Sequence, residues 1–416
     1  MISLRLFYGR DHEDMIRRLQ KAKDEEIFVS TLEVRATFLD EAVIEAITDL
    51  LLAKQVETVQ LDDCGAYLNK QAIRMARALG NVKNLRLSEP TFLCQFFLDC
   101  LLMSATKLAN LRIQDHLSVD QIGALSKGLK ENVGLRVLDL SRSRLDDVSI
   151  LASGLCENKN LNCLKLRSVS LNDQNIGDIV ESLKNHPTLT SLDLSFNHFR
   201  NLDHVSDLVR STTCIRELFL GYQNVWQAPK LDVTQLTRAL KINSSLTKLS
   251  LARNKLNDGD AEVLASALLE NTTLQDLDLR ENKITDCGIT SLTLAVSLNT
   301  AIKRLNVANN PFAEQGTEAL LATVMKNFNI VHIELNDCSN TAWQIRYYAS
   351  LNKGGRRLFV ENPSISVWPL ALEKVNNIDW LRESSGSFKI SAGSEKLDVL
   401  YYLLRGPALF DGRGFN

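Results

Sequence analysis

The residues best suited by type for chemistry are a thiol and two cations that lie close together in the sequence. Cys163, Lys165 and Arg167 occupy alternate positions, so in an extended strand their side chains point to the same side. Nearby cations lower the pKa of a thiol and favour the nucleophilic thiolate. No histidine is placed by the sequence to serve as a base for this thiol. A second interpretation is that Cys163 is a small side chain that lets a partner approach.

Other signatures of catalysis are missing from the sequence. It contains no P-loop, dinucleotide-binding glycine motif, zinc-protease motif or nucleophile elbow, and its six histidines have no metal-ligand spacing. We therefore expect no enzyme activity, no catalytic residue, no cofactor and no metal. The eight cysteines include no C-x-x-C pair, which favours reduced cysteines of the core over a disulfide framework. This cysteine usage predicts an intracellular protein, most simply a cytoplasmic one.

One repeated pattern positions these residues, and it is clearest between residues 246 and 310. Leu246, Leu249, Leu251, Asn254 and Leu256 form the pattern L-x-x-L-x-L-x-x-N-x-L, which recurs 28 residues later and 28 later again. Each copy begins with the alternation of core-facing and outward-facing residues that is typical of a short strand, and continues into a helical pattern, such as residues 260–269. This is the leucine-rich repeat pattern, and its period lies in the expected range.

The same frame covers most of the chain. A second pattern, L-x-x-N-x-x-L, joins each helix end to the next strand, as at Leu129, Asn132 and Leu135. One strand and one helix cannot bury their own apolar faces, so neighbouring repeats must stack into a solenoid. A looser fourteenth strand is expected at Leu358 and Val360. The first apolar positions of the thirteen regular copies are Met1, Val29, Val56, Val82, Leu108, Leu135, Leu161, Leu189, Ile215, Leu246, Leu274, Ile302 and Ile330.

Over residues 1–362 the chain resembles leucine-rich repeat proteins of the ribonuclease-inhibitor type. The resemblance implies an α/β horseshoe of about 13–14 repeats, with a parallel β-sheet on the concave face and helices on the convex face. It also implies that the asparagine of each repeat bonds backbone groups of the turn. That asparagine is kept at Asn197, Asn254, Asn282 and Asn310 but is replaced in the N-terminal repeats. We therefore expect a less regular turn edge there, especially at residues 88–90.

The tail of the chain departs from the repeat. Residues 363–416 contain Trp368, tyrosines and leucines in two helical patterns separated by a polar stretch. A bare last repeat would expose its apolar flank, so we expect this segment to form a C-terminal helical cap. The alternative is a degron or docking peptide at residues 406–416.

Side-chain alternation predicts which residues face the concave side. The third, fifth and seventh positions of each copy point there, the eighth lies near the rim, and equal positions of successive strands form rows. In the fifth-position row Arg86 and Arg112 are adjacent like charges, and a ligand could relieve the repulsion between them. In the eighth-position row Asp63, Glu89 and Asp115 form an acidic track. Alternatively, these charges have no role beyond solubility.

Aromatic residues mark the predicted partner-binding site. Phe196, Phe219 and Tyr222 are the only outward aromatic cluster that the rows predict, and small residues surround them. Exposed aromatic side chains of this kind are typical anchors of protein interfaces. Lys165 and Arg167 flank the cluster on one side and Arg253 on the other, so we place the site between residues 163 and 253.

The longest interval between repeats lies beside this cluster. Trp226 falls one position past a core slot and precedes an insertion at residues 227–230. A longer repeat maps to a bulging loop, often on the binding face. Trp226 is accordingly included in the predicted site, with the alternative that it tucks under the loop.

Charge and hydropathy narrow the class of partner. The net charge is 48 − 50, or −2, so no global field favours nucleic acid, and no run of 18 apolar residues could insert into a membrane. Together with the missing catalytic motifs, the outward aromatic cluster and the family resemblance, this leads us to expect a non-catalytic interaction scaffold or receptor subunit that binds a protein partner on its concave face. The alternative is a GTPase-activating regulator built on the same repeat fold, although the acidic tail of that family is missing.

Overall fold

The computed structural model describes residues 2–7, 12–25, 27–53, 56–67, 70–223, 230–336 and 339–357. The chain divides into two compact units, Met1–Asp232 and Val233–Asn416, each of which is described by itself. Trp226, the expected fourteenth strand and the expected C-terminal cap lie outside the described residues.

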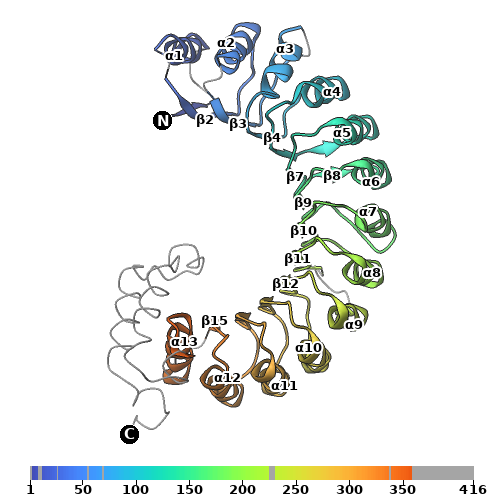
Figure 1. Cartoon of the computed structure of the whole chain (residues 1–416). Coiled ribbons are helices and arrows are strands. Elements are labelled where there is room, and N and C mark those ends of the chain that lie inside the picture. The colour runs from blue at the N-terminus through green and yellow to red at the C-terminus, as the bar shows by residue number, and fades with distance from the viewer. Residues whose placement is uncertain are drawn as a thin grey trace. The chain divides into compact units, whose positions relative to one another are not determined.

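The first unit is one layer of parallel strands covered on one face by helices (Figure 1). The nine described strands of this layer follow one another in chain order, as β1 (Ile2–Phe7), β2 (Val29–Arg35), β3 (Val56–Asp62), β4 (Asn84–Ser88), β5 (Asn110–Gln114), β7 (Val137–Asp139), β9 (Cys163–Lys165), β10 (Ser191–Asp193) and β11 (Glu217–Phe219). The helices that connect them are α1 (His12–Asp24), α2 (Glu41–Leu52), α3 (Lys70–Leu79), α4 (Gln95–Ser104), α5 (Val119–Glu131), α6 (Val148–Glu157), α7 (Ile176–Leu183) and α8 (Asp203–Ser211). Two short strands, β6 (His116–Leu117) and β8 (Arg144–Leu145), pair separately.

The second unit repeats this architecture. Among its described residues, 233–336 and 339–357, four parallel strands also follow chain order, as β12 (Lys248–Ser250), β13 (Asp276–Asp278), β14 (Arg304–Asn306) and β15 (His332–Glu334). Its helices are α9 (Thr234–Ile242), α10 (Asp258–Glu270), α11 (Asp286–Leu298), α12 (Glu314–Lys326) and α13 (Asn340–Lys353).

The predicted frame is confirmed. Each main-sheet strand begins within two residues of a predicted first apolar position. Within each unit the strands pair with equal repeat positions opposite one another, so Leu192 lies between Leu164 and Leu218. All three of these leucines are fully buried between the sheet and the helices. The fold is therefore a leucine-rich repeat solenoid in which each repeat completes the core of its neighbour.

Asparagines explain both sequence patterns. At the end of α10, the Asn271 amide donates to the carbonyl oxygens of Leu240 and Asn243, and its Oδ1 accepts from the N–H groups of Thr273 and Leu274. It thereby ties the end of one helix to the preceding helix and to the next strand. The L-x-x-N-x-x-L spacing places its amide among otherwise unpaired carbonyls at the helix end.

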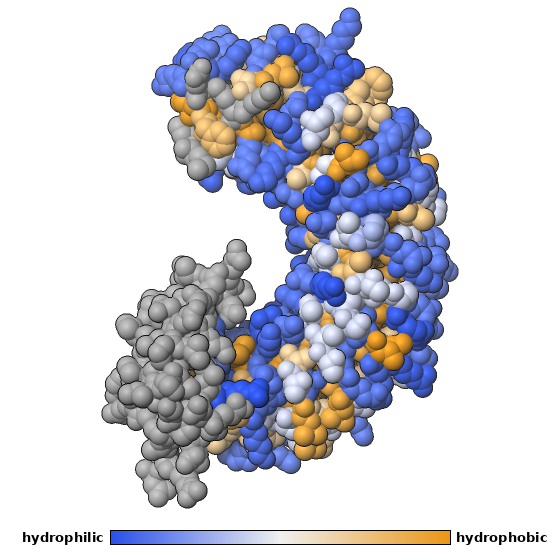
Figure 2. All heavy atoms as spheres, in the orientation of Figure 1, coloured by the Kyte–Doolittle hydropathy of each residue, from blue (hydrophilic) through white to orange (hydrophobic). Residues whose placement is uncertain are grey.

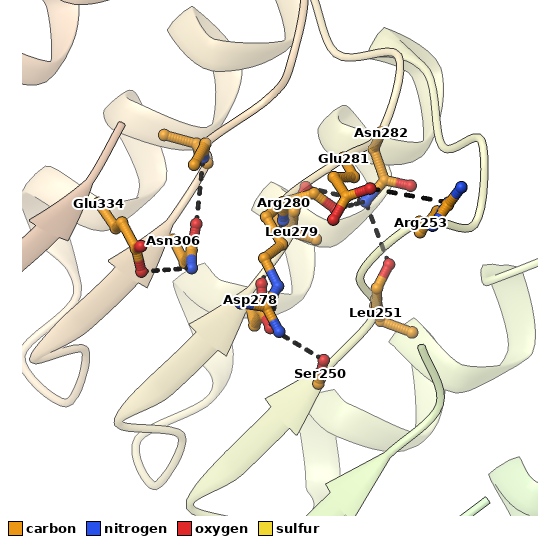
Figure 3. A network of polar contacts seen from close by, with 12 residues as sticks. Ser250, Leu251, Arg253, Asp278, Leu279, Arg280, Glu281, Asn282, Asn306 and Glu334 are labelled. Atoms are coloured by element: carbon orange, nitrogen blue, oxygen red, sulfur yellow. Dashed lines mark hydrogen bonds and ion pairs between the residues drawn. The ribbon is translucent and has the colours of Figure 1, made fainter. Parts of the chain in front are cut away.

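The other asparagine closes the turn after the strand. Asn282 donates from Nδ2 to the carbonyl oxygens of Leu251 (3.1 Å) and Leu279 (2.8 Å) (Figure 3). Its Oδ1 accepts from the N–H groups of Asn254 (2.9 Å) and Leu256 (3.1 Å). One buried side chain thus satisfies four backbone groups of two repeats, as the resemblance implied.

In the N-terminal repeats, the turns that follow the strands are held by different hydrogen bonds. Phe38 and Gly65 form a β-bridge, Thr91 donates its N–H to the Cys64 carbonyl oxygen, and β6 pairs with β8 further along. Without the asparagine, backbone groups of adjacent turns bond one another, and the bonds differ from one repeat to the next. At Asp115 and His116 both N–H groups donate to side chains instead, as expected of a less regular edge.

Candidate functional site

The predicted site residues of the first unit lie on three neighbouring strands. In the fifth-position row, Lys165 of β9 stands between Asp139 and Asp193, and Phe219 of β11 follows Asp193. Lys165 is therefore flanked by a carboxylate on each side. Its charge is locally offset, which makes it a weaker binding candidate than the sequence suggested.

The structure does not support the interpretation of Cys163 as a nucleophile. Burial raises the pKa of the Cys163 thiol, and the opposing effect of Lys165 is smaller. A raised pKa keeps the thiol protonated and poorly nucleophilic. The interpretation of the cysteines as core residues also needs correction: the seven described cysteines are free thiols, but only Cys64 is fully buried, and Cys156 and Cys287 are exposed.

The adjacent arginines are balanced within the chain. Arg86 and Arg112 are register partners, as predicted. Nε of Arg86 lies 3.3 Å from Asp62 and Nε of Arg112 lies 3.8 Å from Asp139. Each arginine has its carboxylate on the strand away from the other, so the pair does not require a ligand to relieve its repulsion.

A regular feature of the eighth-position row escaped the sequence analysis. Ten of its eleven described residues have left-handed backbone conformation, with φ between 47° and 67°. From Ala36 to Phe196, the N–H of each such residue donates to the seventh-position carbonyl of the next repeat, as from Phe196 to Gly221 (2.9 Å). The exception, Asp115, donates instead to Oγ of Ser143. The repeat therefore imposes this conformation regardless of the side chain.

Two predicted site residues stack in this row. The Phe196 and Tyr222 rings lie with centroids 4.0 Å apart and planes 12° from parallel. The Arg167 guanidinium lies 4.0 Å from the centroid of the Phe196 ring. Both rings are half-buried, whereas Arg167 is exposed and Ser195 and Gly221 beneath are buried. The structure thus brings Arg167, Phe196 and Tyr222 into one stack at the rim.

A fourth residue is linked to this stack through its backbone. Arg142 precedes Ser168 and Phe196 in the eighth-position row, and its N–H donates to the Arg167 carbonyl oxygen. Among the residues that the structure describes, neither arginine forms an ion pair. The row position of Arg142 could have identified it, but its charge alone gave no reason to select it. We call Arg142, Arg167, Phe196 and Tyr222 the aromatic–arginine patch.

Neither Arg253 nor Trp226 belongs to the described residues of the first unit. Arg253 belongs to the second unit, where its Nε lies 3.7 Å from Glu281 in a network of charged side chains (Figure 3). In that network, burial raises the pKa of Asp278, although Arg280 and hydrogen bonds partly oppose the effect. Trp226 lies outside the described residues.

The expectation of a single outward aromatic cluster was also wrong. Phe38 and Tyr67 make an edge-to-face contact of 5.0 Å on the turn side of the first unit. Phe38 is 44% exposed and Tyr67 is 76% exposed. This pair follows the strands rather than lying in the predicted rows, which is why the row analysis missed it.

Apolar side chains are also exposed on the helices of the second unit. Leu269, Leu294 and Leu298 are 56%, 66% and 74% exposed, and Figure 2 shows apolar atoms gathered over α11. Leu269 and Leu298 occupy the repeat positions at which the preceding pair of helices has Lys241 and Glu270, joined at 2.7 Å. An apolar pair thus replaces an ion pair at the end of α10 and α11.

The described residues include no group of three or more side chains arranged to hold a metal ion. Of the helices that the structure describes, none has both the length and the apolar character needed to cross a bilayer.

A family model and several solved structures are similar to parts of this chain. A family model described as "Leucine Rich repeat" matches residues 185–202, 243–265 and 270–292. No curated protein matches the chain. An internalin from Listeria monocytogenes is 17% identical, covers 80% of this chain and 91% of its own, and gives a TM-score of 0.47. Two shorter structures each cover 39% of this chain with a TM-score of 0.34: leiomodin-1 actin-binding site 2 (18% identity, 96% of its length) and a Caenorhabditis elegans tropomodulin C-terminal domain (16%, 98%).

Proposed function

We propose that this leucine-rich repeat protein is a non-catalytic scaffold that binds a protein partner through the aromatic–arginine patch. The observation that carries the proposal is the stack of Arg167, Phe196 and Tyr222, in which the two ring centroids lie 4.0 Å apart and the guanidinium lies 4.0 Å from the Phe196 centroid. The left-handed backbone of Phe196 and Tyr222 is common to this position of the repeat and does not by itself mark a site.

The chemistry of the patch fits a protein interface. Aromatic and arginine side chains contribute much of the binding free energy at such interfaces, where they are desolvated together. The stack presents a rigid apolar surface, and the charges of Arg142 and Arg167 are not used by ion pairs with the described residues. A partner with an apolar side chain beside carboxylates would satisfy both features.

The repeat type is part of the proposal. We infer that the solenoid is of the ribonuclease-inhibitor type, because a full helix connects each strand to the next within repeats of 26 to 31 residues. We also place Lys165 and Phe219 at the border of the interface, since both occupy the fifth-position row next to the patch.

Affinity capture from cells of the native source, followed by affinity measurement with the purified partner, tests the proposal. Phe196→Ala with Tyr222→Ala should weaken binding at least about thirtyfold, because interface anchors contribute about 2 kcal/mol or more. Phe38→Ala with Tyr67→Ala is the matched control, since it removes another exposed aromatic pair of the same unit. Equal losses in both variants, or a loss in the control alone, would contradict the assignment.

A further inference from the structure

The aromatic–arginine patch is one end of a longer row of side chains. Three acidic residues, Asp63, Glu89 and Asp115, precede Arg142 at the eighth position of successive repeats. Asp63 and Glu89 are exposed, and Asp115 is half-buried. None of the three forms an ion pair with a described residue. This acidic track differs from the fifth-position row, where carboxylates and arginines pair with one another.

Hydrogen bonds link the row from one repeat to the next. The N–H groups of Asp63, Glu89 and Arg142 donate to the seventh-position carbonyl oxygens of Ser88, Gln114 and Arg167, with lengths between 2.8 and 2.9 Å. Asp115, which lies between Glu89 and Arg142, interrupts this pattern and donates to Oγ of Ser143 instead. The left-handed conformation is shared by both ends of the row, so the same backbone geometry carries Glu89 and Phe196.

The acidic end carries negative charge that the fold does not neutralise. Burial raises the pKa of Asp115, and the charge of Glu89 raises it further, while the hydrogen bond from His116 N–H and the charge of His116 oppose the rise. In the other direction along the row, Arg142 and Arg167 are cations without a carboxylate partner among the described residues. The row thus has an acidic end and a cationic, aromatic end.

We infer that this row binds an extended protein segment with basic side chains at one end and an acidic group beside an apolar side chain at the other. The inference rests on the proposed function, whose patch forms one end of the site, and it adds the chemistry of the partner. Successive repeats are about 4.8 Å apart, so Glu89 and Phe196 are separated by about 19 Å. An extended chain spans that distance in about six residues. Lying across the repeats, such a segment would place opposite charges over each end of the row.

A fluorescent probe peptide tests this inference directly. It carries a lysine–arginine–lysine end, a glycine–serine spacer of about four residues and a glutamate–tryptophan–aspartate end, and it is made in both chain directions. Fluorescence anisotropy at low ionic strength measures its affinity for the full chain. We expect one direction to bind, and a peptide whose basic end is replaced by glycine and serine to bind at least about tenfold more weakly, because it lacks attraction to the acidic track.

Charge reversal on the protein identifies the contact. Asp63→Lys with Glu89→Lys should weaken binding of the probe at least about tenfold and should strengthen binding of a probe whose basic end is made acidic. The matched control is Asp24→Lys with Glu131→Lys, which changes the net charge equally at the exposed ends of α1 and α5. It should change the affinity less than about twofold.

The outcomes separate this inference from the proposed function. If the probe and the peptide without a basic end bind equally, and Phe196→Ala with Tyr222→Ala abolishes both, the acidic track is not used and only the further inference fails. If the aromatic substitutions leave probe binding unchanged while the charge reversal abolishes it, the segment does not use the proposed patch and both fail. Absence of binding in both chain directions also overturns the inference.

Discussion

The left-handed conformation of Phe196 and Tyr222 allows stability and binding to be separated by substitution. Their φ angles are 61° and 62°, and the equivalent position of a repeat in the second unit holds Asn309 at 57°. Left-handed conformation costs an L-residue about 1–2 kcal/mol, and asparagine tolerates it better than alanine does. Two double variants, with both aromatic residues replaced by alanine or by asparagine, therefore differ in a predictable way.

Both variants lose the same contacts of the native chain. The ring stack contributes about 0.5–1.5 kcal/mol and the Arg167 contact contributes about 0.5–1 kcal/mol, so each variant should lose about 1–2.5 kcal/mol from these terms. A several-fold preference of asparagine for the left-handed region corresponds to about 0.5–1 kcal/mol at each position. The asparagine variant should consequently be about 1–2 kcal/mol more stable than the alanine variant.

Urea unfolding measures this difference in the free energy of unfolding, provided that both variants show the same dependence of that free energy on urea concentration. The affinity for the partner is measured on the same preparations. Both variants should lose partner binding equally, at least about thirtyfold, although their stabilities differ. If the alanine variant is the more stable, the backbone conformation does not carry the strain that we assign to it. If both variants bind normally while losing more than about 3 kcal/mol, the rings serve packing alone.

Three further variants test individual contacts of the fold. Asn282→Ala leaves four buried backbone groups without their partner, so urea unfolding should show a loss of at least about 3 kcal/mol. Burial raises the pKa of Asp40, but hydrogen bonds from the backbone and His12 and the charge of His12 lower it more, to below its ordinary value. The ionised Asp40 therefore stabilises the fold fully above its ordinary pKa, and this stabilisation is lost as the pH falls through its lowered pKa. The Asp40→Asn variant should accordingly lose less stability on acidification than the native chain. Leu269→Lys with Leu298→Glu should change stability by less than about 0.5 kcal/mol while raising solubility, because it replaces exposed apolar surface by an ion pair.

The arrangement of strands and helices was predictable because it depends on spacing alone. Leucines at fixed intervals must face the core. The asparagine at the end of α10 bonds this helix end to the preceding helix and to the next strand, so the register of the repeats follows directly from the sequence. The helical pattern at residues 260–269 lies within α10, and the structure adds that Asn257 and Asp260 cap this helix reciprocally.

The properties of individual side chains were less predictable because they depend on distances between repeats. The sequence placed Arg86 beside Arg112 correctly but could not reveal that Asp62 and Asp139 lie close enough to neutralise them. Likewise, the two cations near Cys163 suggested a lowered pKa, whereas burial of the thiol has the larger effect.

The eighth position shows why a uniform repeat can carry a specific surface. In repeats with the turn asparagine, side-chain amides close the edge after the strand, and in the N-terminal repeats backbone groups close it. Glu89 and Phe196 nevertheless share the same left-handed conformation and the same hydrogen bond to the next repeat. Since the backbone there is fixed by its neighbours, exchanging the side chain alters charge and shape without altering the solenoid. This independence is the physical basis for assigning partner recognition to this row rather than to the paired charges of the sheet.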